Sequence, residues 1–233
     1  MLRETRGATC DPLDQAVADY ERQHAMHIDL HVHTRERSAC GQASEADQVR
    51  AAIAAGLDAI VLTDHHRLAP AERLAALNAT HAPFRIFGGI ELSLDDEDFI
   101  VLGVQDVRLE SRAWCYPDLH AFIRAAGGFL ALAHPFRFHP DIRVDLERFR
   151  PDAIEVYSHN TPPAAAAHIV ALAARLGLHP LSNSDAHATA ALGTHYNVLD
   201  HNPANERELI ALLKTGQFSI RNTQPPDDKE AGA

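Results

Sequence analysis

Short, largely β-branched apolar runs alternate along this chain with longer amphipathic segments. An apolar run of a few residues, bounded by turn residues, is typical of a buried strand. Seven runs fit that description, and the pattern predicts strands at 27–32, 59–63, 84–90, 99–104, 129–133, 153–157 and 179–182.

The segments between these runs have the start and stop signals of helices. Ser44 and Asp47 resemble a capping box, and Gly56 can close the helix that follows. Proline at the first turn and glycine at the end predict the other helices. These begin at Pro70, Pro117, Pro163 and Pro203, and the last three end near Gly127, Gly177 and Gly216.

Alternation of strands and helices predicts an α/β fold of βα units with a parallel sheet, and about seven strands favour a closed, TIM-like (β/α)7 barrel. A length of 233 residues, 46% of them hydrophobic, suits one domain. We expect this domain at 26–222, a peripheral segment with a helix at 1–25 and, from the composition of TQPPDDKEAGA, a disordered tail at 223–233.

Charge and cysteine content narrow the possible partners. Lys and Arg number 21 against 32 Asp and Glu, a net charge of -11, which argues against binding duplex nucleic acid by broad phosphate neutralisation. The cysteines Cys10, Cys40 and Cys115 are odd in number and lack CxxC spacing, so a reducing cytoplasm is expected. No apolar stretch approaches a membrane span, and the polar first residues do not resemble a signal peptide. The pattern gives no indication of the oligomeric state.

Histidines and carboxylates follow or interrupt the apolar runs at regular points. In parallel α/β barrels the carboxyl ends of the strands form one rim, where functional groups gather. The residues at these points are His31, His33, Asp64, His65, Glu91, Asp98, His134, His159, Asp185 and His187.

The chemistry of this set favours a metal centre. His31 and His33 alternate by two, so both rings lie on one face of an extended strand. Surface or core histidines could explain one HxH, but TDHH at 63–66 and SDAH at 184–187 repeat the arrangement. Mixed imidazole and carboxylate ligands suit Zn, Mn or Fe, and Glu91 could bridge two ions. We therefore expect two or three divalent cations.

The motifs DLHVHT, GLDAIVLTDHH, GGIE, LAHP and SDAH resemble, in order and spacing, the PHP (polymerase and histidinol phosphatase) family over residues 26–220. The resemblance implies a distorted seven-stranded barrel with a di- or trinuclear centre that hydrolyses phosphate esters. It implies that His31, His33, Glu91 and Asp185 bind one metal and that Glu91 and His134 bind a second. Asp64, His65 and His187 become candidates for a third metal or for supporting roles.

The chain departs from the family pattern at two places. Asp98 stands where many relatives have a histidine before the strand that reads VLG, and it is either a ligand or a solvated acid. SACG stands where others have an acidic residue or histidine, so Cys40 is either a ligand or a small packing residue. His159 could ligate, support a ligand or contact substrate.

Hydrolysis of a phosphate ester would proceed through a metal-bound water, and no side-chain nucleophile is needed. His65 or His187 could protonate the leaving alkoxide if one of them is free of metal. Guanidinium groups bind phosphate in a bidentate fork, which nominates Arg137, with Arg35 and Arg67 beside the first two motifs. For each arginine, the alternative is an exposed surface charge.

These features predict a phosphoesterase that acts on a small phosphomonoester or a nucleotide. Two alternatives remain open. The same metal centre could hydrolyse a carbon-nitrogen bond, with release of ammonia or an amine. The chain could also be a non-catalytic PHP module that binds metal and a partner.

Overall fold

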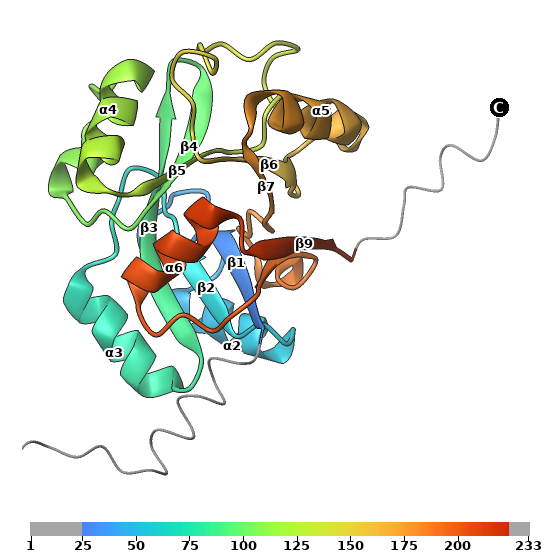
Figure 1. Cartoon of the computed structure of the whole chain (residues 1–233). Coiled ribbons are helices and arrows are strands. Elements are labelled where there is room, and N and C mark those ends of the chain that lie inside the picture. The colour runs from blue at the N-terminus through green and yellow to red at the C-terminus, as the bar shows by residue number, and fades with distance from the viewer. Residues whose placement is uncertain (1–24, 224–233) are drawn as a thin grey trace, which may run out of the picture.

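A computed structural model describes residues 25–223, which form a nearly closed, barrel-shaped sheet of nine strands with five α-helices around it (Figure 1). The helices are α2 Glu45–Ala54, α3 Ala71–His81, α4 Tyr116–Ala126, α5 Ala166–Leu176 and α6 Glu206–Thr215. The strands are β1 Met26–Val32, β2 Ala59–Leu62, β3 Arg85–Leu94, β4 Glu97–Leu102, β5 Phe129–Leu132, β6 Ala153–Tyr157, β7 His179–Ser182, β8 His195–Leu199 and β9 Phe218–Asn222. The helix predicted within 1–25 and almost all of the predicted tail lie outside the described residues.

The predicted barrel is confirmed, but the prediction of seven parallel strands is wrong. The strand order is β7-β6-β5-β4-β3-β2-β1-β8-β9, and β4 and β8 run antiparallel to the strands beside them. A two-residue hairpin joins β3 to β4, with Asp95 and Asp96 both at positive φ, as a type I′ turn requires. The sequence has Asp-Asp here instead of the usual glycine and therefore carries no clear hairpin signal.

The sheet closes where β7 returns to β1. The backbone N–H of His33 donates to the carbonyl of Ala186 at 2.9 Å, and the N–H of Ala186 donates to His31 O at 3.2 Å. Ser182 donates its N–H to Asn197 Oδ1 at 3.2 Å and its hydroxyl to Arg221 O at 2.6 Å, which links β7 to β8 and β9. These bonds bring the first and last motifs of the sequence together.

Helix α6 covers the barrel at the end where the parallel strands begin. Leu209, Ile210 and Leu213 of α6 are buried in one apolar cluster with inward-facing residues such as Ile28 and Phe129. Two further clusters fill the space between the sheet and the outer helices. One end of the barrel is thus filled with apolar side chains, which leaves the opposite rim for polar chemistry.

A register shift in β1 sets the direction of the first histidines. Ile28 and Leu30 belong to the interior cluster, whereas Val32 packs in the outer cluster with α2. Strict alternation would have put all three on one face, but the pairing of β1 with β2 shifts between Asp29 and Val32. His31 and His33 therefore lie on the face opposite Val32, toward the barrel axis.

The helix signals were mostly confirmed. Ser44 caps α2 by accepting the Asp47 N–H at 3.1 Å, and Gly127, Gly177 and Gly216 end their helices in the left-handed conformation. Pro203 does not open α6, because the N-cap is Asn205, whose side chain accepts from the Glu208 N–H. Within residues 25–223, no helix combines the length and apolar character needed to cross a membrane.

Candidate metal centre

The structure brings the predicted ligands together at the rim opposite α6. His31 lies at the end of β1 and His33 just after it, Glu91 lies within β3, and His134 follows β5. The residues around Asp64 and Asp185 follow β2 and β7 in the same way. Among the described residues, three groups of side chains could each hold a cation: His31, His33 and Asp185; His31, Glu91 and His134; and His33, Cys40, His65 and His187.

The first group is compact and fully buried. The Nε2 atoms of His31 and His33 are 3.0 Å apart, and Asp185 Oδ1 lies 3.4 and 3.1 Å from them. Each of the three side chains is at most 1% exposed. Two ring nitrogens and a carboxylate oxygen thus face one point from which solvent is excluded.

Glu91 connects this group to the other two. Its Oε2 lies 3.3 Å from His31 Nε2, 3.1 Å from His33 Nε2 and 3.0 Å from His65 Nδ1. Its Oε1 lies 3.0 Å from His134 Nε2. One carboxylate therefore faces different ligand groups with its two oxygens, which is the arrangement of a bridging ligand.

The third group lies nearer to solvent. The ring of His33 stacks on His65 at 4.6 Å and on His187 at 4.3 Å between centroids. Ligand atoms of these three histidines and of Cys40 all lie within 4.8 Å of one another. His65, His187 and Cys40 are partly or fully exposed, so this group forms the outer part of the centre.

Buried charges shift the pKa values of the ligands. Burial lowers the pKa of His33, but contacts with Asp185 and Glu91 outweigh it and raise the pKa to about 9. The pKa of His31 is raised well above its ordinary value for the same reason, although burial again opposes protonation. Burial would raise the pKa of Glu91 and Asp185, yet the nearby histidines hold both pKa values below the ordinary carboxyl range. Protons on the rings thus neutralise the carboxylates when no metal is bound.

The outer histidines behave differently. Burial lowers the pKa of His65 to about 4, and the pKa of His187 is also lowered, chiefly by burial and next by the charge of His33. Both rings are therefore neutral at neutral pH, which is the protonation state of an imidazole ligand.

Two buried oxygens show that the residues present fit a cation. Glu91 Oε2 and Asp185 Oδ1 are buried and make no hydrogen bond, although ring nitrogens surround both. An unsatisfied buried carboxylate oxygen is costly, and coordination to a cation would remove that cost. Nitrogen and oxygen donors of this kind suit zinc, manganese or iron.

Two acids without a motif of their own hold the candidate ligands in place. Glu155, in the middle of β6, accepts a hydrogen bond from His31 Nδ1 at 2.9 Å and from the His134 backbone N–H at 2.8 Å. The bond to Nδ1 leaves the lone pair of His31 on Nε2, where the cation would bind. Asn183 donates to the same Glu155 oxygen at 2.7 Å. An alternating strand pattern gave no signal that Glu155 faces the centre.

Asp29 is a second missed acid. Burial raises its pKa to about 7, despite hydrogen bonds from the Ser184 hydroxyl and N–H and from the His31 N–H. These bonds tie the segment before Asp185 to β1.

Backbone conformation also marks the site. His134 and Asp185 have φ values of 23° and 52°, in a region that non-glycine residues seldom occupy. Such strained conformations concentrate at functional sites, where the surrounding structure enforces them.

Asp64 is engaged elsewhere in this structure. Its Oδ1 accepts from the Thr34 N–H at 2.6 Å and the Ser38 hydroxyl at 2.9 Å, and its Oδ2 accepts from the Thr34 hydroxyl and Arg37 Nε, both at 2.8 Å. Both oxygens are therefore occupied in fixing the loop that follows His33.

The remaining predicted residues lie at different distances from the centre. Asp98 Oδ2 lies 3.8 Å from His134 Nε2, and a guanidinium nitrogen of Arg137 lies 3.5 Å from the same atom. Both side chains therefore border the group formed by His31, Glu91 and His134. His159 is exposed, and its Nε2 lies 3.0 Å from the Thr194 hydroxyl. Arg35 is exposed, and only its backbone N–H has a described bond, to Ala43 O at 2.8 Å.

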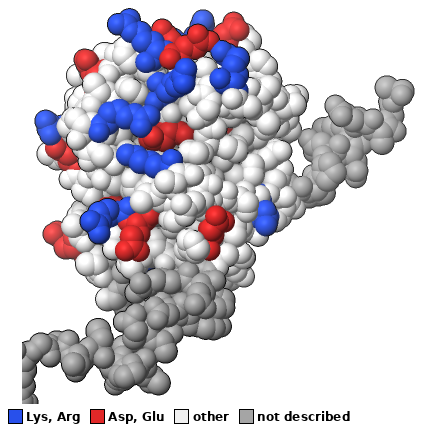
Figure 2. All heavy atoms as spheres, in the orientation of Figure 1, with Lys and Arg blue, Asp and Glu red and all other residues white. Residues whose placement is uncertain are grey.

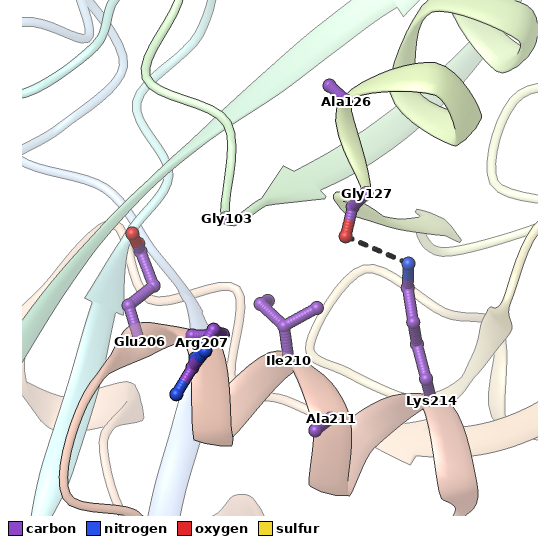
Figure 3. A pocket seen from close by; sticks show the side chains of 8 residues that line it. All are labelled: Gly103, Ala126, Gly127, Glu206, Arg207, Ile210, Ala211 and Lys214. Carbon is purple, nitrogen blue, oxygen red and sulfur yellow. Dashed lines mark hydrogen bonds between the residues drawn. The ribbon is translucent and has the colours of Figure 1, made fainter.

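A cleft of about 630 Å³ opens beside the outer group. It is lined by Arg37, Ser38, Ala39, Cys40, His65, His66, Arg67, Ser93, Glu110 and Arg112. A hollow of about 350 Å³ between α6 and the end of α4, where Lys214 donates to Gly127 O, lies at the opposite end of the barrel and contains none of the predicted ligands (Figure 3). The cleft is therefore the one relevant to the metal centre.

Solved structures with this fold come from several organisms. PsfC from Pseudomonas syringae is 24% identical, with a TM-score of 0.63 over 86% of this chain and 92% of its own. A two-domain protein from Bacteroides vulgatus containing a predicted PHP-like metal-dependent phosphoesterase is 15% identical, with a TM-score of 0.57 over 85% of this chain and 65% of its own. The lesion-specific endonuclease PfuEndoQ from Pyrococcus furiosus is 17% identical, with a TM-score of 0.62 over 84% of this chain and 57% of its own. This chain thus spans less than two thirds of the latter two proteins, and the likeness to all three concerns the fold.

No curated protein matched this chain. Its residues 29–217, however, match the sequence profile of the PHP domain. That range includes every ligand candidate at the rim, from His31 to His187. The chain belongs to the PHP domain family.

Proposed function

We propose that this protein is a metal-dependent phosphoesterase that hydrolyses a small phosphomonoester or a nucleotide phosphate. The observation that carries the proposal is Glu91, whose two oxygens face separate ligand groups, one oxygen being buried without a hydrogen bond. Adjacent cations sharing a carboxylate are typical of centres that stabilise both the attacking and the leaving oxygen of a phosphoryl transfer.

The ligands divide among the three groups. His31, His33, Glu91 and Asp185 would hold the first cation, and Glu91 with His134 the second, with Asp98 beside it. His65 and His187 would take part in a third position. Asp64 would support the centre through the loop after His33, because its oxygens are already bonded to that loop. Bound divalent cations would activate water and neutralise charge on the transferred phosphoryl group.

Basic groups near the centre would bind the substrate. Arg137 is 30% exposed and lies 3.9 Å from Asp185 and 3.5 Å from His134, so its guanidinium can reach a phosphate at the centre. Arg67 and Arg112 line the cleft beside His65, and a cleft of about 630 Å³ suits a ligand the size of a nucleotide. Arg35 and His159 are exposed and stay predictions as further substrate contacts.

The leaving alkoxide needs a proton, and His65 and His187 are the candidates. The Nδ1–H of His187 donates to Asp185 O at 2.9 Å, which leaves a lone pair on Nε2. A neutral ring with a free lone pair binds a cation when one is present. In a centre with only the first two cations, the same ring could relay a proton instead.

A duplex nucleic acid is not proposed as substrate. On the face seen in Figure 2, basic side chains gather mainly over the part that carries α4, with acidic groups among them. The net charge of -11 also opposes a long polyanion.

Release of inorganic phosphate from a panel of phosphomonoesters and nucleotides tests the proposal. Protein loaded with Mn²⁺ or Zn²⁺ should hydrolyse at least one compound. His33→Ala should reduce the rate by at least about a hundredfold, because loss of a residue that coordinates the metal directly costs more than loss of one that only supports a ligand. His201→Ala, at an exposed histidine in the connection from β8 to α6, is the matched control and should leave the rate unchanged. Equal rates in the wild type and His33→Ala would contradict the proposal, as would the absence of phosphate release from every compound.

A further inference from the structure

We propose that Cys40 supplies a thiolate ligand to the third cation position, which it forms with His65 and His187. The inference rests on the proposed metal centre and adds the chemical class of the ion at its outer position. With a sulfur and two imidazole nitrogens, this position would take zinc or a similar borderline ion, in contrast to the carboxylate-rich inner positions.

The position of Cys40 carries the first step. Its sulfur lies within 4.8 Å of ligand nitrogens of His33, His65 and His187, which approach from β1, β2 and β7. Cys40 is exposed and lines the cleft, so it is not the small buried packing residue that its sequence context also allowed.

The loop that carries Cys40 is held on both sides. Before it, the Ser38 hydroxyl donates to Asp64 Oδ1 at 2.9 Å and also accepts the His65 N–H at 2.9 Å. After it, the Gln42 N–H donates to the carbonyl of His187 at 2.8 Å. Cys40 is thus fixed between backbone bonds to both histidines of the proposed site.

Close packing at Gly41 keeps the loop in this place. A Cβ on Gly41 would lie 2.5 Å from the Thr34 carbonyl carbon and 2.6 Å from its oxygen. Only glycine allows the loop to approach the backbone after His33 so closely, directly next to Cys40.

The ring nitrogens have suitable lone pairs. The Nδ1 atoms of His65 and His187 face Glu91 Oε2 at 3.0 Å and Asp185 O at 2.9 Å, respectively. The hydrogen bond to Asp185 O places a proton on His187 Nδ1 and leaves its Nε2 free to coordinate. His65 Nδ1 makes no such bond, so this ring can turn either nitrogen to a cation. Three protein ligands next to an open cleft match the pattern of zinc sites that keep one position for water or substrate.

Cobalt(II) substitution gives a readout that does not depend on activity. Coordination by a thiolate produces a near-ultraviolet sulfur-to-cobalt charge-transfer band, and we expect it in the wild type. It should disappear in Cys40→Ser, together with one equivalent of bound metal. Cys10→Ser and Cys115→Ser are the controls, because these are the other cysteines of the chain, and both should keep the band. Absence of the band from the wild type, or its persistence in Cys40→Ser, would overturn the proposal.

Thiol reactivity tests the same contact without altering Cys40. In the Cys10→Ser/Cys115→Ser protein, Cys40 is the remaining thiol. Saturation with Zn²⁺ should slow its reaction with an aromatic disulfide reagent by about tenfold or more, because bound metal withdraws the thiolate. An unchanged rate at saturating zinc would contradict coordination. Neither measurement requires turnover, so failure of this proposal can be distinguished from failure of the phosphoesterase assignment, which phosphate release tests.

Discussion

The Nε2 atoms of His31 and His33 lie 3.0 Å apart, a distance at which two nitrogens bearing protons would repel and two bare lone pairs would also repel. The buried oxygens of Glu91 and Asp185 face the same two nitrogens without hydrogen bonds. A bond from one ring nitrogen to the other would satisfy the two nitrogens but would leave both carboxylate oxygens without a donor. A cation among them would satisfy all four atoms at once.

Metal binding should therefore release protons. In the metal-free protein, burial opposes protonation of His33, but Asp185 and Glu91 raise its pKa to about 9, and the proton must leave before the ring can ligate. Metal affinity should rise as the pH increases toward 9 and level off above that value. Calorimetric titration with Mn²⁺ in buffers of different ionisation enthalpy measures the number of protons released, and a count of zero would contradict the prediction.

The raised pKa of His33 makes the stability of the metal-free protein fall with increasing pH, whereas metal affinity should rise. The pKa of His33 is raised in the folded state from 6.5 to about 9, so its ion pairs stabilise the fold fully below pH 6.5. That contribution is lost as the pH rises through 9. The urea midpoint of chelator-treated protein should fall across this window, and it should fall less when metal is bound. A midpoint that rises with pH in the metal-free protein would contradict the assignment of the proton to the ring.

Glu155→Gln should weaken metal binding without removing a ligand. One oxygen of Glu155 accepts from His31 Nδ1 and the other from the His134 N–H. An amide can replace only one of these acceptors, so we expect metal affinity to fall about ten- to hundredfold. Competition with a chelating dye measures the change. Glu147→Gln is the matched control, since Glu147 is 69% exposed and paired with Arg175 on the surface, and its affinity should equal that of the wild type.

The candidate ligands stand out in the sequence because each lies in or beside a short motif near the end of an apolar run, and the structure brings them close to one another. The HxH of β1 and the SDAH after β7 carry their geometry in local spacing, and the barrel then brings them together. The residues that orient them could not be predicted in this way. Glu155 meets His31 across 124 positions of sequence, and only the closed sheet places them in contact. An acid in the middle of an apolar strand gives no local sign of its partner.

The strand topology was predicted less well than the candidate ligands, because the local signals for one turn and two strands are weak. The turn between β3 and β4 has Asp95 and Asp96 at positive φ, where glycine or asparagine is the usual signal, so the sequence pattern predicts β4 as another parallel strand. Its antiparallel direction has a functional consequence, because Asp98 lies at the start of β4 and still reaches the rim where the other strands end. β8 and β9 were missed because His195–Leu199 and Phe218–Asn222 alternate with polar residues and lack a continuous apolar run.

Gly41→Ala should disturb the outer part of the metal centre. An added Cβ would lie 2.5 to 2.8 Å from backbone atoms of Thr34 and Arg35, which cannot move aside as a side chain could. We expect a loss of stability of about 1–3 kcal/mol, the usual range for overpacking, together with weaker metal binding because the loop contacts His187. Denaturant unfolding and metal titration measure the two effects.

The control for this variant is Gly56→Ala. Gly56 has a φ of 79° and no atom within 4 Å of the added Cβ, so its substitution should lower stability by about 1 kcal/mol through backbone conformation alone. Metal affinity should stay at the wild-type value. Equal metal affinity in Gly41→Ala and Gly56→Ala would show that the packing at Gly41 does not position the centre.

Arg137→Ala should impair substrate binding at the mouth of the centre. The guanidinium lies 3.5 Å from His134 Nε2 and its carbon is 4.9 Å from the Phe138 ring centroid, so the group is held beside the second ligand group. Loss of a charged hydrogen-bond donor, worth about 1.5–3 kcal/mol, should lower kcat/KM about ten- to a hundredfold. Arg137→Lys should recover part of the loss, since it keeps the charge but not the bidentate fork. Arg148→Ala is the matched control, because Arg148 lies in the same way over Phe149, at 5.0 Å, and should leave kcat/KM unchanged. Equal values of kcat/KM for Arg137→Ala and Arg148→Ala would show that Arg137 is a surface charge and not a phosphate ligand.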